Sequence, residues 1–378
     1  MDFDLTAEQQ KRFDDLRDAL ISASPEPDGS GAPYDRDRWQ EVARLGLTGL
    51  CLPTEYGGGG LDTLDTALGL EAFGEGYADT GLVFAVSAHL LACAVPIRDF
   101  AGDDVRAELL PGLASGALIA ANAMTEDEAG SDLRTPSVTA RRDGDHYVLH
   151  GEKSFASNAP AADVIVTYAV TDPGAGFLGL SGFAVPRNLP GIHVSEPFTK
   201  MGLSSCPAGR VRFDGCAVPA RYLLGREGQG TAVFTHSMQW ERTCLFAGYL
   251  GMMNRQLARC AEQARERRQF SKPIGSFQAV SHRIAGMKQR LEAARLLLYR
   301  AAWLLARDRP DTTAIALAKL AVSEAAVANS LDAIQVFGGS GYLAGTGVER
   351  NLRDAVPSTL FSGTSEIQRN LVAQSLGL

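Results

Sequence analysis

The stretch HYVLHGEKSFASNAPAADVIVTYAV, residues 146–170, decides the fold because it carries two short strand-like runs separated by a turn. The runs are HYVLHGE and DVIVTYAV, and each mixes apolar with polar residues at the spacing of a half-buried strand. Three more such runs, GFAVP, IHVSEP and RVRFDGCAVP, follow between Gly, Pro and Asp turns. Residues 115–225 therefore predict a β-domain.

Both sides of this β-domain have the character of helices. Residues 1–114 read mainly as helices, with breaks at 24–35 and at the turn-rich LPTEYGGGGL, 52–61. After residue 225, apolar side chains recur three and four residues apart along one stripe, formed by Ile284, Met287, Leu291, Ala294, Leu298, Ala301 and Leu305. DRPDTT, 308–313, ends that helix, and a second runs from 314 to 337. We predict a mostly α-helical chain with a helical domain at 1–114, a β-domain at 115–225 and a helical domain at 226–378.

Composition argues against several classes of partner and site. The chain has 378 residues, 45% of them hydrophobic, and a net charge of −8, which gives no basic field for nucleic acid or an anionic membrane. The six cysteines form no CxxC pair, which argues against a metal site and a disulfide framework. The acidic N-terminus does not resemble a signal peptide, and no segment is expected to reach the length of a membrane span. We expect a cytoplasmic protein.

The glycine run FGGSGYLAG, 337–345, looks like a dinucleotide fingerprint. A helix-like segment precedes it where a Rossmann turn needs a strand, which argues against a classical NAD site. The alternative is a glycine that ends a helix.

Several blocks stand in an order that resembles the acyl-CoA dehydrogenase superfamily, and together they span almost the whole chain. The blocks are PTEYGGGGL (53–61), AMTEDEAGSDL (123–133), GEKSFASNA (151–159), KMGLSSCPAGRVRFDGCAVP (200–219), ERRQFSKPIGSFQ (266–278), QVFGGSGY (335–342) and FSGTSEIQR (361–369). The resemblance implies a helical domain, a β-barrel-like domain and a four-helix-bundle domain, with FAD as the cofactor.

The resemblance assigns four residues to the flavin ring. The backbone of Met124 and the hydroxyl of Thr125 would approach the isoalloxazine, while Phe155 and Ser157 stand where the family usually has Trp and Thr. Ser157 can still donate a hydrogen bond. The alternative for Thr125 is a helix N-cap, because TEDE reads like a capping box.

A second group matches positions that bind the pyrophosphate and adenosine of FAD, largely from a neighbouring subunit, which implies a homodimer or homotetramer. Its members are Arg267, Gln278, Gln335, Gly338 and Gly339. The alternative for RERRQ, 265–269, is a solvated basic face of a helix. Thr364 and Glu366 match positions beside the same nucleotide, although Glu366 could also lie at an exposed helix start.

The catalytic base of the family is a glutamate that most members place directly before the Gly-Thr of the last block. Here Ser362 occupies that place, and a serine hydroxyl is too weak a base to replace it. A minority of the family places the glutamate before an arginine on the first helix after the β-domain, where Glu241 and Arg242 stand. The resemblance makes Glu241 the base, and the alternative is a structural ion pair of Glu241 with an arginine.

The resemblance also assigns Ser131, Trp240 and Ser362 to the substrate. His89 and His282 are the other acid-base candidates, and we expect a satisfied or surface histidine at each position.

Within the superfamily, blocks such as SMQWERTCLFAGYLGMM and SFASNAP resemble the prolyl-carrier-protein dehydrogenases of pyrrole and antibiotic biosynthesis. These enzymes oxidise L-proline, held as a thioester on the phosphopantetheine of a peptidyl carrier protein, to a pyrrole-2-carboxyl thioester, with molecular oxygen as the electron acceptor. One alternative is a short- or branched-chain acyl-CoA dehydrogenase that passes electrons to an electron-transfer flavoprotein. Another is a flavin-binding homologue without turnover. The presence of a carboxylate at Glu241 argues against it.

Overall fold

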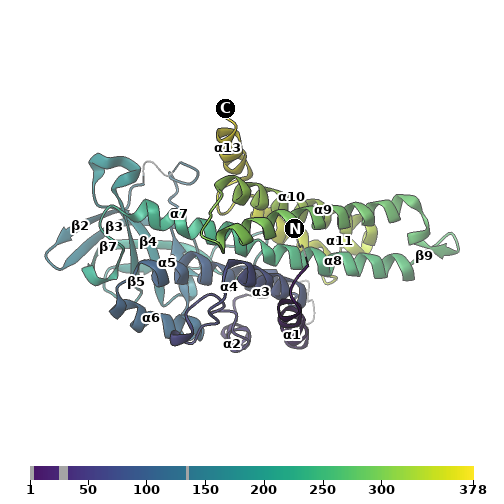
Figure 1. Cartoon of the computed structure of the whole chain (residues 1–378), viewed down its shortest axis with the longest axis horizontal. Helices are drawn as coiled ribbons and strands as arrows, with labels where there is room; N and C mark the ends of the chain where they lie inside the picture. The colour runs from purple at the N-terminus through teal and green to yellow at the C-terminus, as the bar shows by residue number, and fades with distance from the viewer. Residues whose placement is uncertain (1–3, 25–32, 133–135) are drawn as a thin grey trace.

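A computed structural model describes residues 4–24, 33–132 and 136–378, and its element order is helices, strands, helices (Figure 1). The fold class predicted from the sequence is thereby confirmed. The N-terminal helices are α1 (Ala7–Ala23), α2 (Arg36–Arg44), η1 (Thr54–Tyr56), α3 (Thr63–Gly76), α4 (Thr80–Ala88), η2 (His89–Ala94), α5 (Val95–Phe100) and α6 (Asp103–Ala114). Of the break predicted at 24–35, residues 25–32 lie outside the described residues.

The central sheet contains all five strand-like runs of the sequence. Its strands are β1 (Ala120–Ala123), β2 (Thr139–Asp143), β3 (His146–Ser157), β4 (Val164–Val170), β5 (Leu180–Pro186), β6 (Ile192–Val194), β7 (Ala208–Pro219) and β8 (Leu223–Leu224), with 3-10 turns η3 (Ala159–Ala161), η4 (Pro173–Gly179) and η5 (Ala220–Tyr222). The strand order is β6-β7-β3-β1-β4-β5-β8, and β2 pairs with both β3 and β4. Because β1 also joins β3 to β4, these four strands close a ring, which makes the domain barrel-like.

The C-terminal part is built from long helices. They are α7 (Gly230–Trp240), η6 (Glu241–Leu245), α8 (Ala247–Glu266), α9 (Gln278–Leu305), α10 (Thr312–Phe337), α11 (Gly339–Tyr342), α12 (Val348–Ala355), η8 (Val356–Thr359) and α13 (Ser365–Ser375). The short hairpin β9 (Arg268–Gln269) and β10 (Lys272–Pro273), followed by η7 (Ile274–Ser276), joins α8 to α9 at the right-hand end of Figure 1. The predicted apolar stripe of α9 is buried from Met287 to Ala301.

A glycine ends α10, as one of the two readings of FGGSGYLAG predicted. Gly338 has φ 61° and its amide donates to the carbonyl of Ile334 at 2.9 Å. A helix rather than a strand thus leads into the glycine run.

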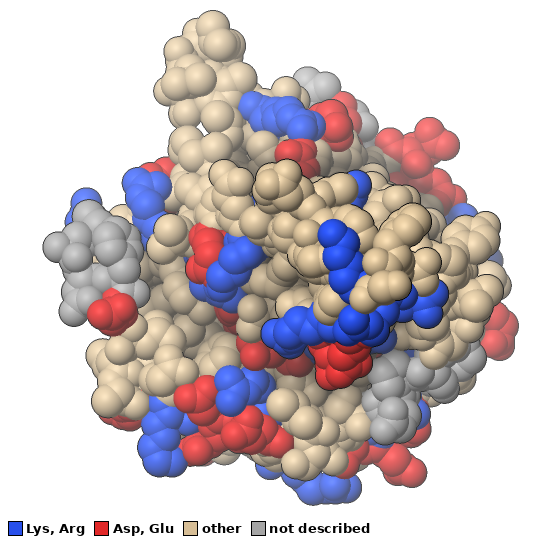
Figure 2. Space-filling model, turned by 90° about the vertical axis from the view of Figure 1, so that its right-hand side faces the viewer, with Lys and Arg blue, Asp and Glu red and all other residues tan. Residues whose placement is uncertain are grey.

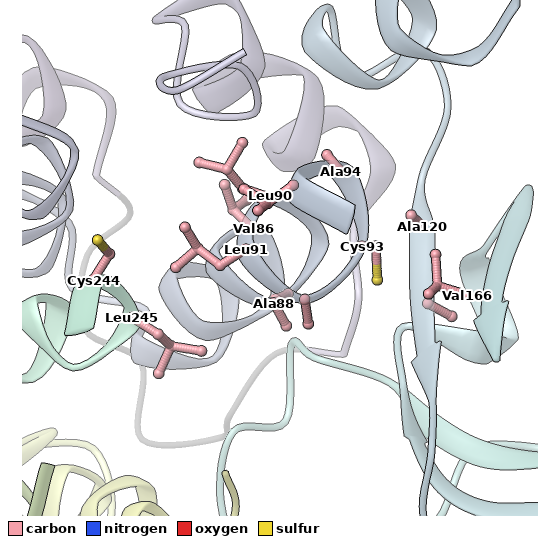
Figure 3. Close-up of a cluster of buried hydrophobic side chains, with 14 of the residues drawn as sticks. Val86, Ala88, Leu90, Leu91, Cys93, Ala94, Ala120, Val166, Cys244 and Leu245 are labelled. Atoms are coloured by element: carbon pink, nitrogen blue, oxygen red, sulfur yellow. The ribbon is translucent and has the colours of Figure 1, made fainter. Parts of the chain in front are cut away.

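The prediction that no segment reaches the length of a membrane span is wrong. Two helical stretches, Thr80–Phe100 and Thr312–Phe337, are long and apolar enough by length and composition, and core helices pass the same test. The first is buried from Thr80 to Ile97, because α4, η2 and the start of α5 run through the centre of the protein. In Figure 3 its Leu91 and Cys93 lie between Leu245 on one side and the sheet residues Ala120 and Val166 on the other. One continuous core therefore joins the first helical domain to the sheet and to η6.

Candidate active site

A cavity of about 850 Å³ lies where the sheet meets the helices. Its wall comes from α4, from β1 and the loop after it, from β3, and from two long loops around residues 198–208 and 356–364. This cavity brings together eight of the residues singled out in the sequence: Met124, Thr125, Ser131, Phe155, Ser157, Glu241, Ser362 and Thr364. Its volume is in the range of small-molecule and cofactor sites.

A buried lysine shapes the loop that carries Met124 and Thr125. Lys153, fully buried on β3, donates to the carbonyl of Met124 at 3.0 Å and to Oε1 of Glu126 at 2.7 Å. Burial alone would raise the pKa of Glu126, but the charge and hydrogen bonds of Lys153, together with Ser137, lower it. The ion pair fixes the backbone beside the cavity.

The capping-box alternative for Thr125 is wrong. Residues 124–132 form turns and an isolated bridge between Glu126 and Ala129, without a helix. The carbonyl of Thr125 accepts from the amide of Ser154 at 2.7 Å, so strand β3 holds this loop.

Strand β3 supplies the two residues that stand at the family's usual Trp and Thr positions. Phe155 has φ 55°, leaves 63% of its surface exposed and lies 5.5 Å from the Phe198 ring, centroid to centroid. Ser157 pairs with Asn122 of β1 in the sheet. One polar atom of this wall, Oδ1 of Asn122, is buried without a hydrogen-bond partner among the described residues.

Glu241 opens the π-helical turn η6 between α7 and α8, and only 6% of its surface is exposed. Its Oε1 accepts a hydrogen bond from the hydroxyl of Ser362, while its Oε2 has no hydrogen-bond partner within the described parts of the chain. Burial raises the pKa of Glu241, and the Ser362 hydrogen bond and the Arg242 charge offset only part of that rise. The position of this carboxylate in the cavity wall and its raised pKa are those expected of a catalytic base.

Arg242 does not form the ion pair that the alternative required. Its Nε donates to the carbonyl of Ser362 at 2.8 Å, and none of the salt bridges among the described residues includes Glu241. The half-buried Arg242 instead anchors the backbone of the loop that carries Ser362.

Trp240 lies outside the wall of the cavity. The guanidinium of Arg98 stacks on its ring at 4.5 Å from the centroid, so its contact is with the first helical domain.

His89 and His282 lie as expected, one as a buried histidine with both nitrogens satisfied and the other on the surface. His89 is fully buried, with Nδ1 accepting from the amide of Ala120 at 3.0 Å and Nε2 within 3.1 Å of the Leu113 carbonyl. Both ring nitrogens are therefore satisfied, and burial lowers the pKa of His89 to about 4. His282 is exposed on α9.

The residues matched to the FAD pyrophosphate and adenosine lie elsewhere. Arg267, Gln278, Gln335, Gly338 and Gly339 are all exposed, around the ends of α8 and α10 and the start of α9. This is the right-hand end of the protein in Figure 1, and Figure 2 looks onto it: arginine and lysine side chains gather there, with acidic side chains directly beside them. Within one chain the structure does not bring this group to the cavity.

Thr364 links the cavity to α13. Its hydroxyl caps the helix by accepting from the amide of Ile367 at 3.4 Å, and Glu366 lies exposed in the first turn. Hydrogen bonds from its own backbone amide and from Thr364 lower the pKa of Glu366. The geometry matches the helix-start reading of Glu366 and leaves its assignment to the nucleotide a prediction.

Comparison with known proteins gives the family. Models of the acyl-CoA dehydrogenase N-terminal, middle and C-terminal domains match residues 15–117, 121–216 and 228–377. The chain belongs to the acyl-CoA dehydrogenase family. It is 54% identical to an L-prolyl-[peptidyl-carrier protein] dehydrogenase of Pseudomonas fluorescens over 342 residues, 90% of each chain.

Solved structures of other family members superpose closely. The structure of PigA with FAD and proline gives a TM-score of 0.96 at 40% identity and covers 100% of both chains. The prolyl acyl carrier protein oxidase AnaB gives 0.96 at 38% identity, covering 99% of this chain and 100% of its own.

Sequence reasoning missed several residues of this site, among them Asn122, Lys153 and Phe361. Lys153 had a signal, because the alternation Tyr147, Leu149, Gly151 puts it on the inward side of its strand. Asn122 and Phe361 had none, since each meets the cavity through contacts distant in sequence.

Proposed function

We propose that this protein oxidises an L-prolyl group, held as a thioester on the phosphopantetheine of a peptidyl carrier protein, to a pyrrole-2-carboxyl thioester. The similarity to the Pseudomonas dehydrogenase and to the PigA and AnaB structures supports this substrate. The ring loses four hydrogens in two successive dehydrogenations. Molecular oxygen takes two electrons and two protons in each cycle and leaves as hydrogen peroxide. The reaction belongs to secondary, antibiotic-type metabolism.

The observation that carries the proposal is the position of Glu241. The α-proton of a thioester leaves only to a base that is within reach and ionised, and a buried carboxylate with a raised pKa is a stronger base than an exposed one. Glu241 lines the cavity with such a pKa and keeps one carboxylate oxygen without a hydrogen-bond partner among the described residues. Ser362 stands where most of the family places this base.

FAD, when bound, supplies the acceptor for the hydride from the substrate. The cavity fits its ring: the wall offers Asn122 Oδ1, which has no hydrogen-bond partner among the described residues, and the exposed side chain of Phe155. In this proposal Met124, Thr125, Phe155 and Ser157 hold the ring. Ser131 and Ser362, which also line the cavity, contact the substrate.

The nucleotide half of FAD binds, in this proposal, at the end of the helical domain of a second copy. Arg267 and Gln335 are exposed there beside large apolar side chains, Phe270 at 87% exposure and Tyr342 at 81%. An arginine suits phosphate oxygens, and the apolar side chains suit burial against another subunit. The active protein is therefore a homodimer or homotetramer. Its six free, buried cysteines suit the reducing cytoplasm.

Mass spectrometry of prolyl-carrier protein after aerobic incubation with the FAD-loaded enzyme tests the function. We expect the carrier to lose the mass of four hydrogens, and we expect butyryl-CoA and isovaleryl-CoA to bleach the flavin slowly or not at all. Faster bleaching by either CoA ester than by prolyl-carrier protein would favour a short- or branched-chain acyl-CoA dehydrogenase instead.

A further inference from the structure

Glu241 is held by one side chain within the described parts of the protein. The hydroxyl of Ser362 donates to Oε1, whereas Oε2 is buried without a hydrogen-bond partner there. The two residues are 121 positions apart in the chain, so the contact is made by the tertiary fold. A carboxylate with one oxygen held and the other unoccupied keeps both a fixed orientation and free lone pairs for a proton.

The loop fixes Ser362 before any substrate arrives. Ser362 has φ 56° and Gly363 follows with φ 85°, so two successive residues are left-handed. Arg242 Nε donates to the Ser362 carbonyl at 2.8 Å, and Gln368 Nε2 donates to the Gly363 carbonyl at 3.1 Å. A residue held in this sparsely populated region needs such contacts to stay there.

Glu241 and Arg242 are neighbours in the chain, and each forms a hydrogen bond with a different atom of Ser362. Glu241 accepts from the hydroxyl of Ser362, and Arg242 donates to its carbonyl. We name the three residues the Ser362 clasp. Because both contacts start from the same turn, η6, they fix the side chain of Ser362 relative to the carboxylate.

We propose that Ser362 is a positioning residue for Glu241: it holds the carboxylate toward the cavity and favours its ionised form. This inference rests on the proposed function, in which Glu241 is the base. A serine hydroxyl cannot itself remove the α-proton, but as a donor it stabilises a carboxylate more than the corresponding acid. Ser362 stands at the position that carries the base in most of the family. In this protein it would instead support Glu241, the base on another helix.

Other groups also act on Glu241 and are shared by every variant of Ser362. The charge of Arg242, beside it in the chain, lowers the pKa of Glu241. Cys93 of η2 and Tyr168 of β4 also face it, and their pKa values are raised chiefly by burial and further by the Glu241 charge. Lys319 of α10 is fully buried near Arg242, and burial followed by the Arg242 charge lowers its pKa to about 8. Removal of the Ser362 hydroxyl leaves all four in place.

The test compares Ser362→Ala with Ser362→Gly. Both lose the hydroxyl, but glycine accepts the left-handed φ without strain, so an effect common to the two comes from the hydroxyl. Anaerobic flavin bleaching by prolyl-carrier protein is measured against pH in the FAD-loaded enzyme. We expect the rate, which rises as Glu241 loses its proton, to rise at a pH about one unit higher in both variants. Ser375→Ala, at an exposed site on α13, is the matched control and keeps the parental profile.

A second measurement needs no substrate. The absorbance of bound FAD is titrated with pH in the parent, in Glu241→Gln and in the two Ser362 variants. An ionisation that is absent in Glu241→Gln and moves upward in Ser362→Ala and Ser362→Gly supports the clasp, whereas an unmoved ionisation overturns it. Failure of the parent to bleach with prolyl-carrier protein contradicts the proposed substrate, and this titration still decides the role of Ser362.

Discussion

At the scale of single residues, the decisive feature is the buried carboxylate of Glu241, whose pKa is raised by burial. Replacing Glu241 with glutamine keeps the size and the hydrogen bond to Ser362 but removes the basicity. We expect Glu241→Gln to bind FAD and to bleach with prolyl-carrier protein about 10² to 10⁴ times more slowly than the parent, the usual loss for a general base. Anaerobic stopped-flow absorbance measures this rate.

The control for that variant is Glu8→Gln, which removes an exposed carboxylate on α1 far from the cavity. Both variants must first match the parent in flavin spectrum and melting temperature, because loss of a buried group can also unfold a protein. If folded, FAD-loaded Glu241→Gln bleaches at the parental rate, Glu241 is structural and another base must act.

The resemblance pointed to Glu241 because the usual position of the base holds a serine and a minority of the family places the base before an arginine at this helix; its role as the base stays a prediction. The sequence could not predict the partner of that carboxylate. Ser362 was predicted to contact substrate, and its hydrogen bond to Glu241 depends on a tertiary contact that no local pattern encodes. Trp240, which the resemblance assigned to the substrate, stacks against Arg98 instead, because adjacent helical residues face different directions.

At the scale of elements, the residue pattern was enough for strands β3 to β7 and for α9 and α10, but not for the short strands β1, β2 and β8. It was not enough for the two π-helical turns, η2 and η6, which pack together behind the cavity. A π-turn changes the backbone hydrogen bonds without a distinct residue preference, so apolar spacing does not reveal it. Burial explains the error about membrane length: the helical run Thr80–Phe100 is mostly apolar because residues 80–97 lie inside the core.

Strand β3 fixes the loop of Met124 and Thr125 through Lys153, and this gives a second prediction. In Lys153→Met the Glu126 carboxylate stays buried without its cation, which typically costs about 3–5 kcal/mol. We expect a lower melting temperature and a reduced FAD content after purification, because the loop beside the ring position loses its support. Differential scanning calorimetry and the flavin-to-protein absorbance ratio measure the two effects.

Two further variants separate the ion pair from general damage to the strand. Lys153→Met combined with Glu126→Gln removes the stranded charge and should recover much of the lost stability. Lys288→Met, which breaks an exposed pair with Glu292 on α9, should change the stability by less than about 1 kcal/mol. A parental melting temperature and FAD content in Lys153→Met would show that the buried pair does not hold the loop.

At the scale of the whole molecule, one chain keeps the two groups of predicted FAD residues apart: the cavity group lies between the sheet and the helices, and the other lies at the end of the helical domain. A single cofactor can use both groups only if the second comes from another copy.

We therefore expect Arg267→Ala to weaken FAD binding about 10- to 100-fold, the loss of one charge-assisted phosphate contact. Arg265→Ala removes a neighbouring exposed arginine of α8 and should change the affinity little. Titration of the apoprotein with FAD, with sedimentation velocity on the same samples, measures affinity and assembly together. Parental affinity in Arg267→Ala, or a stable monomer that retains its full complement of FAD, would contradict a site shared between subunits.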